Sequence, residues 1–233
     1  MFLHFLYYLG RLKQAFMEPY SGKMSARNYF NYLETALIIL LALVPLFLTF
    51  PYRVNIFLSW EGAYRMSNGE LPFRDFGTPL GGMYWVIPAI FFKLFGPGMF
   101  TLVKAQVFIN IISGLAFRSI LKSCGVNAGV RLTSVFLYCL SFSFFNFWPW
   151  YNHTVIVYEF IALALLLKFI TGTGRYIYLW LVAAALFTIF SFLTKQDGGG
   201  MCFGISLLLL TWYAWAYKKI MPLLVYAGSF ILL

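Results

Sequence analysis

The sequence predicts an all-α protein, a polytopic transmembrane helical bundle, and two observations support this class. Hydrophobic residues make up 62% of the 233 residues and aromatic residues 21%, whereas charged residues account for only 10%. A soluble domain of this length would lack the polar side chains needed to cover its surface. The apolar residues also form runs long enough to cross roughly 30 Å of hydrocarbon as helices that rise about 1.5 Å per residue. We therefore expect an integral membrane protein with a single transmembrane domain over residues 1–233.

Six segments meet or approach the length of a membrane crossing. They are residues 33–50, 99–121, 132–147, 154–170, 177–193 and 201–217. A seventh apolar run begins near Met221, and the sequence stops within it, so we expect a chain that is truncated after residue 233. A bundle of membrane helices accounts for every apolar run in the sequence.

The first ten residues are apolar, but no basic region precedes them and no small-residue cleavage site follows them. This pattern does not fit a secretory signal peptide. Because Arg11 and Lys13 follow directly, we expect a short amphipathic helix on the membrane surface. It would belong to a cytoplasmic interfacial segment formed by residues 1–32.

Residues 82–95 are apolar but short, and we interpret them as a helix in the membrane interface. With that choice, eleven of the seventeen lysine and arginine residues fall on the side of the N-terminus. The positive-inside rule then makes this side cytoplasmic. Counting 82–95 as a crossing would move Arg118, Lys122 and Arg131 to the outer side and weaken the bias. We therefore expect a long first outer loop, residues 51–98, that carries interfacial helices.

The net charge of +10 does not require a nucleic acid partner. Basic residues beside membrane crossings are explained by orientation and by anionic lipid headgroups, so membrane lipid is the expected partner of this charge. The three cysteines are scattered and lack the spacing of a metal site.

Residues 59–82 form a polar, charged stretch between apolar segments and are the first place to look for chemistry. Three of the seven acidic residues lie there, namely Glu61, Glu70 and Asp75. The expected topology brings two further polar segments to the same face, residues 148–153 and 194–198. Most side chains capable of chemistry would then gather at the outer ends of the helices.

Asp75 has two readings. It either caps a turn or pairs with a loop arginine, since Asp is favoured at such positions, or it acts as a general base. Glu61 is the other candidate base. Trp60, beside it, is either an anchor at the membrane interface or a platform on which a sugar stacks.

Lys195 ends a long apolar segment on the outer side, where the positive-inside rule disfavours a lysine. It either extends to the lipid headgroups or holds a phosphate, assisted by the backbone N–H groups of residues 197–200 at the start of the next helix. His153 is either a hydrogen-bonding residue or part of a catalytic site. Glu159 lies within a crossing, where a carboxyl group is costly, so it should face the protein interior.

The order of these motifs resembles the first outer loop of the GT-C membrane glycosyltransferases, which include the protein O-mannosyltransferase, aminoarabinose transferase and dolichyl-phosphate-mannose-mannosyltransferase-like proteins. The matching features are Gly-Glu-Leu-Pro-Phe-Arg-Asp-Phe at residues 69–76, then a proline and glycines, then an apolar helix ending Phe-Lys-Leu-Phe-Gly. Phe-Leu-Thr-Lys-Gln at residues 192–196 is similar to a lysine-bearing turn of the same family. The resemblance covers roughly residues 33–200.

The resemblance implies transfer of a sugar from a polyprenyl-phosphate donor at the outer face of a membrane, expected to be the bacterial inner membrane. Asp75, or alternatively Glu61, would be the base, and Lys195 with Arg74 would lie near the donor phosphate. The implied lining of the site is Trp60, His153, Glu159 and Asp197. The chemistry requires no cofactor, while the acceptor and any dependence on a divalent metal stay undetermined.

Two features depart from the family pattern. Family members carry an Asp-Glu pair early in the loop, where this sequence has Asn55-Ile56 or Trp60-Glu61, and their chains are much longer. Two other functions therefore stay open. A flippase or transporter of lipid-linked sugars would also place charged residues among its helices, and a non-catalytic membrane scaffold would need no complete set of acids.

Overall fold

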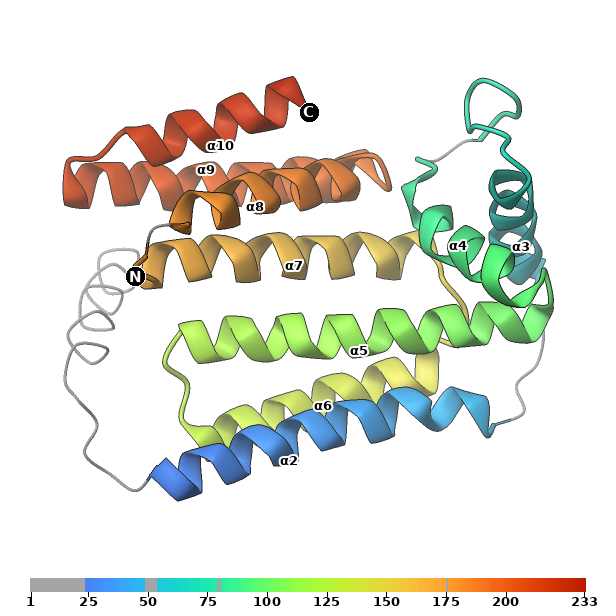
Figure 1. Ribbon diagram of the computed structural model, residues 1–233, viewed down its shortest axis with the longest axis horizontal. Coiled ribbons are helices and arrows are strands. Elements are labelled where there is room, and N and C mark those ends of the chain that lie inside the picture. Colours follow the sequence, from blue (N-terminus) through green and yellow to red (C-terminus); the bar gives the residue numbers. More distant parts are fainter. Residues whose placement is uncertain (1–23, 49–53, 79–80, 175) are drawn as a thin grey trace.

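The computed structural model describes residues 24–48, 54–78, 81–174 and 176–233, and it contains no strand within them. The segment expected to form a surface helix at residues 1–10 lies outside the described residues. The helices, labelled as in Figure 1, are α2 (Met24–Leu43), α3 (Val54–Ser67), α4 (Val86–Phe95), α5 (Met99–Ser123), α6 (Ala128–Phe145), α7 (Tyr151–Thr171), α8 (Ile177–Phe192), α9 (Gln196–Tyr217) and α10 (Met221–Leu232), with 3-10 turns η1 (Val44–Leu46) and η2 (Met83–Trp85).

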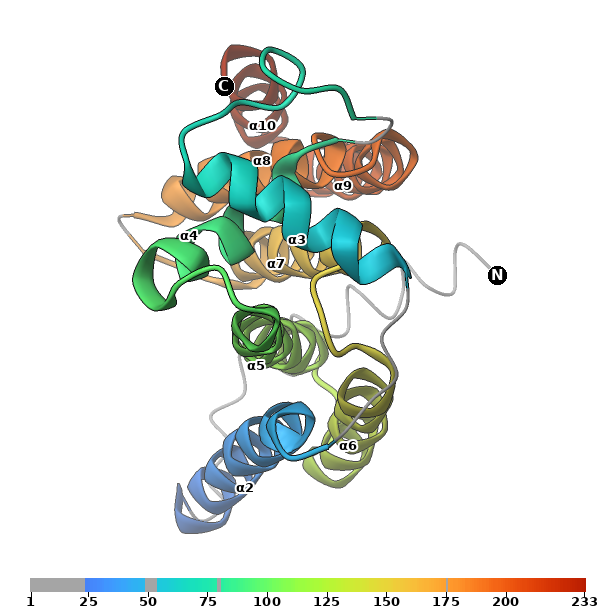
Figure 2. The same cartoon turned by 90° about the vertical axis from the view of Figure 1, so that its right-hand side faces the viewer.

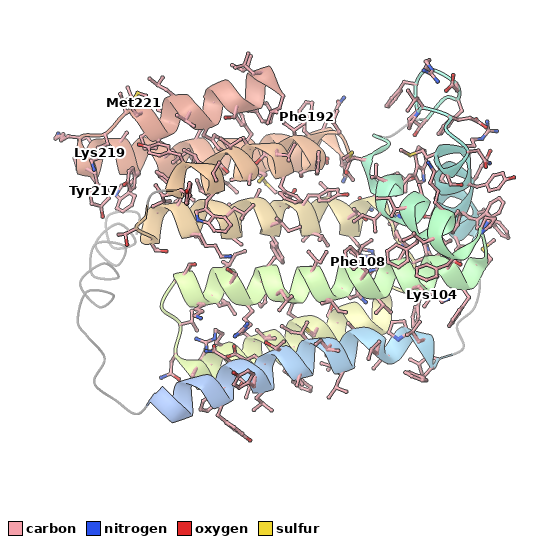
Figure 3. The ribbon with its side chains drawn as sticks, in the orientation of Figure 1. Lys104, Phe108, Phe192, Tyr217, Lys219 and Met221 are labelled. Carbon is pink, nitrogen blue, oxygen red and sulfur yellow. The ribbon has the colours of Figure 1, made fainter. Side chains whose placement is uncertain are left out.

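The long helices lie side by side along one direction, and α3 crosses that direction at one end of the bundle (Figure 1). Seen along the bundle axis, α2 and α6 form one edge, α5 and α7 the middle, and α8, α9 and α10 the opposite edge (Figure 2). We call the end that carries α3, α4 and the α8–α9 connection the loop end. The opposite end, with the connections at 124–127 and 218–220, is the basic end. Lys104 and Lys219 mark these two ends in Figure 3.

Among the described residues, four helices are long and apolar enough to cross a membrane, which indicates an integral membrane protein. They are α5, α7, α9 and the segment Tyr29–Leu46 of α2 and η1. Four of the six predicted crossings are therefore confirmed in length and composition. The other two correspond to shorter apolar helices, α6 and α8. With 16 residues, α8 extends about 24 Å, less than the roughly 30 Å of a hydrocarbon core.

Apolar packing forms separate clusters, and one of them fixes the loop end. Ile56 and Ala63 of α3 are buried against Phe92 of α4 and Leu102 of α5. A larger cluster joins α7, α8, α9 and α10. Because buried apolar side chains supply most of the stabilisation in a contact, the cluster at Ile56 holds α3 firmly across the ends of the other helices.

The sequence predicts a polar, charged stretch between apolar segments over residues 59–82, whereas in the structure residues up to Ser67 belong to α3. Its buried positions, Ile56, Ser59 and Ala63, recur at helical spacing, while its charges lie on the other face. Gly62 permits close packing, because a Cβ there would lie 2.0 Å from Cε2 of Trp85. The sequence did not predict this helix, because its apolar face is narrow and charged residues separate the apolar positions.

Candidate active site at the loop end

Asp75 lies in a tight turn that follows α3, and its carboxylate is fully engaged. Its Oδ1 and Oδ2 accept hydrogen bonds from Nε and Nη2 of Arg74 at 2.9 and 2.7 Å, and Oδ2 accepts another from the Leu71 N–H at 2.7 Å. Phe73 within the turn has a left-handed φ of 68°. The Arg74 guanidinium and then the Leu71 N–H lower the pKa of Asp75 from 3.8 to about 2. In this state Asp75 closes a turn and is a weak base.

Glu61 lies on the exposed face of α3, next to Arg65 one turn later. Arg65 bridges two acids, with Nη2 3.1 Å from Glu61 Oε1 and Nη1 3.1 Å from Glu70 Oε2. These carboxylates raise the pKa of the Arg65 guanidinium, which stays charged. The guanidinium also lies over the ring of Phe76, 5.3 Å from its centroid. Glu61 and Glu70 therefore share one cation at the surface.

Trp60 is half-buried, and both its ring and its indole N–H contact other parts of the protein. Its Nε1 donates to the Pro97 carbonyl at 2.8 Å, and its ring stacks on Tyr64 with the centroids 4.9 Å apart. It also contacts the cluster around Phe92. Trp60 thus fastens α3 to the α4–α5 connection.

The loop contacts the lysine-bearing turn between α8 and α9 directly. The Met83 N–H donates to the Leu193 carbonyl at 3.3 Å. A Cβ at Gly81 would lie only 1.8 Å from that same oxygen, so only glycine fits there. On the other side, the Tyr158 hydroxyl of α7 donates to the Met83 carbonyl at 3.3 Å. Two segments more than one hundred residues apart in sequence are therefore held together by backbone contacts.

Lys195 is the residue that precedes α9, and its ammonium pairs with Asp197 in the first turn. Its Nζ lies 3.2 Å from Asp197 Oδ2, while Asp197 Oδ1 accepts the Gly198 N–H at 2.8 Å. A carboxylate is favourable at a helix N-terminus, because the backbone N–H groups there carry partial positive charge. Asp197 thus already occupies the position that an anionic ligand would take.

Glu159 is half-buried on α7 and faces the first turn of α9. A Cβ on Gly198 would lie 2.7 Å from Glu159 Oε1, which shows how closely the carboxylate approaches the glycine run. Glu159 lies beside Ser191 and within electrostatic reach of Lys195 and Asp197. The fold therefore groups Glu159, Lys195 and Asp197, three residues drawn from α7 and the start of α9.

His153 is half-buried in the first turn of α7, also at the loop end. Within the described residues no ion pair joins the Asp75–Arg74 turn to the Lys195–Asp197 pair. The predicted site residues thus share one end of the molecule but form separate groups. In the part of the chain that the structure describes, no three histidine, cysteine or acidic side chains gather in the manner of a metal site. The expectation that the chemistry requires no cofactor stays a prediction.

Among the described residues, the most deeply buried charges lie at the basic end, and the sequence analysis does not predict them. Glu34 of α2 has a side chain with 0% exposure, and its two oxygens lie 2.6 Å from Arg118 Nε and 2.8 Å from Arg131 Nε. Arg118 also donates to Asn31 Oδ1 at 2.9 Å. We call Glu34, Arg118 and Arg131 the buried triad. In the sequence, both arginines are explained as signals of membrane orientation, and the available signal for the triad is a single glutamate within an apolar run.

Comparison of the chain with family models, with curated proteins and with solved structures finds no match. The resemblance to the GT-C glycosyltransferases therefore rests on the sequence motifs at the loop end.

Proposed function

We propose that this chain is a membrane glycosyltransferase, or the membrane portion of one, that transfers a sugar from a polyprenyl-phosphate donor at the loop end. The observation that supports this proposal is the contact between the loop and the lysine-bearing turn, made by Gly81, Met83 and Leu193. These are the two segments that carry the resemblance, and a common site requires them to be neighbours.

In this proposal the donor phosphate displaces two carboxylates from their basic partners. Arg74 and Lys195 are each paired with a nearby acid, and both pairs are at least partly exposed. The same N–H groups that bind a carboxylate also bind a phosphate. When Arg74 turns to the phosphate, Asp75 loses the partner that most strongly lowers its pKa. Donor binding thereby converts Asp75 into a stronger base.

The chemical step is a displacement at the anomeric carbon. Asp75 accepts the proton of the acceptor hydroxyl, whose oxygen attacks that carbon. The bond from carbon to the phosphate oxygen breaks, and its electron pair leaves with the phosphate. Lys195 and Arg74 stabilise the charge that develops on the leaving group. The loop end would face outward, so that the basic end and the N-terminus are cytoplasmic, as the positive-inside rule requires.

A non-catalytic scaffold is the second candidate, and the pairing of the loop acids favours it. Glu61, Glu70 and Asp75 each already have a cationic partner. Such pairs stabilise a turn without any turnover, and their presence alone does not imply a ligand.

The experiment is a turnover assay on the purified full chain. We expect it to consume a polyprenyl-phosphate sugar, with a membrane extract as the source of acceptor, and to release polyprenyl phosphate. Asp75→Asn should lower the rate by about 10²–10⁴-fold, the usual cost of losing a general base, while donor binding persists. Glu70→Gln is the matched control and should have little effect.

Three outcomes would contradict this assignment. If Glu61→Gln abolishes transfer and Asp75→Asn does not, the base is Glu61. If the folded chain moves the donor between leaflets without consuming it, the protein is a transporter. If it neither binds nor consumes the donor, the scaffold function holds.

A further inference from the structure

At the basic end, a half-open cleft lies between the C-terminal turns of α5 and α7, helices that run side by side in Figures 1 and 2. Its volume is roughly 440 Å³, within the roughly 300–1,000 Å³ typical of sites for small ligands. The lining residues are Leu115, Arg118, Ser119, Lys122, Ser123, Lys168 and Thr171.

The lining has a strongly positive character. Arg118, Lys122 and Lys168 all contribute to it, and none of the seven lining residues is acidic. Each helix C-terminus contributes about half a negative charge, and Glu34 pairs with both Arg118 and Arg131 beside the cleft. These groups together carry four positive charges against about two negative ones. Like charges that face one concave surface repel each other, and a bound anion would remove this repulsion.

The arrangement follows from helical spacing. The five residues from α5 lie at intervals of three and four, which places them on one face of the helix. Lys168 and Thr171 are likewise three residues apart on α7. Ser119 and Ser123 supply hydroxyl donors between the cations, whereas the Thr171 hydroxyl already donates to the Leu167 carbonyl at 2.8 Å.

The buried triad positions one wall of the cleft. Arg118 uses Nε and Nη2 to bind Glu34 and Asn31, and its Nη1 takes part in none of these bonds. Since the side chain is held by three hydrogen bonds, it loses little additional freedom when a ligand binds. Its position is therefore set before the ligand arrives.

The surroundings of the cleft place it at the depth of lipid headgroups. Lys168 lies over the ring of Trp180, with Nζ 5.0 Å from the ring centroid. Trp180, Tyr176, Tyr178 and Trp215 are all exposed near this end. Exposed Trp and Tyr residues gather at the boundary between the hydrocarbon core and the headgroups.

We propose that this cleft binds a phosphate group, chiefly that of an anionic phospholipid. Basic pockets between membrane helices are suited to phosphate-bearing headgroups, and each lysine near the surface strengthens binding about fivefold. This site lies at the end opposite the proposed transfer site and does not depend on that function.

The test uses the purified full chain in detergent and measures the affinity for phosphatidylglycerol, with phosphatidylcholine as the neutral reference. Lys122→Gln combined with Lys168→Gln should weaken phosphatidylglycerol binding by about 30-fold. The matched control combines Lys218→Gln with Lys219→Gln, which removes two charges at the same end outside the cleft. It should change the affinity less than about threefold, because salt screens charges that do not contact the bound headgroup.

Two further arms complete the test. Lys122→Arg with Lys168→Arg keeps both charges and should bind the lipid like the wild type, which separates loss of charge from loss of folding. Competition with inorganic phosphate shows which part of the ligand is recognised. If millimolar phosphate displaces phosphatidylglycerol, the cleft binds the phosphate group alone. If it does not, and the lipid still binds selectively, the cleft recognises the lipid headgroup. Equal affinity for phosphatidylglycerol and phosphatidylcholine without any phosphate binding, or equal losses in the cleft and control variants, would overturn the proposal.

Discussion

The two ends of the bundle carry ion pairs of opposite kinds. At the basic end, the buried carboxylate of Glu34 joins arginines 84 and 97 residues away, on α5 and α6. At the loop end, each described pair joins residues no more than five apart in the sequence, and the side chains are at least partly exposed. The first kind fixes helices to each other. The second contributes little to the fold and is free to exchange partners with a ligand.

The difference follows from solvation. An exposed pair contributes about 0–1 kcal/mol, because water and salt screen it. A buried pair whose partner is removed leaves a charge without solvent or counterion, which costs about 3–5 kcal/mol. The two ends should therefore respond very differently to the loss of one carboxylate.

The largest effect is expected for Glu34→Gln. This change leaves the buried Arg131 and the partly buried Arg118 without their carboxylate counterion and should lower the free energy of unfolding by about 3–5 kcal/mol. The measurement is unfolding in mixed micelles by titration with a denaturing detergent. Glu70→Gln at the loop end is the control and should change that free energy by less than about 1 kcal/mol.

Replacing all three members of the buried triad by leucine distinguishes an electrostatic effect from a packing defect. Removal of every charge should recover a large part of the stability, since a buried ion pair contributes little net energy compared with apolar residues. Equal stabilities of Glu34→Gln and Glu70→Gln would show that the two ends do not differ in this way.

A smaller effect is expected for Gly81→Ala, which disrupts the contact between the loop and the lysine-bearing turn. The added Cβ would lie 1.8 Å from the Leu193 carbonyl oxygen, so the segments must separate. Overpacking of this kind costs about 1–3 kcal/mol. Spin labels on the loop and the turn should report a longer distance. Gly77→Ala is the control, since nothing lies within 4 Å of the added atom.

If Gly81→Ala leaves the distance between the labels unchanged, the two segments are not fastened at this point. The proposed site would then lose the contact that supports it.

The smallest effect on the fold concerns the Asp75–Arg74 pair. Arg74→Gln should raise the pKa of Asp75 from about 2 toward 3.8, because the guanidinium is the largest cause of the shift. Since the folded pKa is the lower one, the pair stabilises the turn above about pH 3.8 and that contribution disappears as the pH falls through 2. An NMR titration of the isotope-labelled carboxyl group measures the pKa of Asp75. An unchanged pKa in Arg74→Gln would show that the pair does not hold the turn.

Several features of the molecule could be predicted from the sequence because they depend on local pattern. Long apolar runs indicated α5, α7 and α9, whereas the interfacial position expected for residues 82–95 stays a prediction. Glu159, expected to face the protein interior, does lie against Gly198. Periodicity and chain length carry this information directly.

Other features could not be predicted, because they depend on partners distant in sequence. No residue close to Glu34 in the sequence identifies Arg118 as its counterion. Counting basic residues on each side of the membrane does not show which acidic residues they pair with. The apolar face of α3 could not be predicted, because charged residues lie between its apolar positions in the sequence. The role of Asp75 could not be decided between a turn cap and a general base. Neighbouring Asp and Arg residues in a sequence do not show whether the two side chains form an ion pair in the absence of a ligand.

The most direct test of the central claim, that the loop end binds a donor phosphate by exchange of carboxylate partners, is the affinity of the full chain for polyprenyl phosphate in two variants. Lys195→Met should weaken binding about tenfold, because it removes a charged contact. Asp197→Asn should strengthen binding, because it removes the competing carboxylate 3.2 Å from the Lys195 ammonium. Lys218→Met at the basic end is the control and should leave the affinity unchanged. Opposite changes in the two loop-end variants are the predicted result, and unchanged affinity in both, with the proteins correctly folded, would contradict the claim.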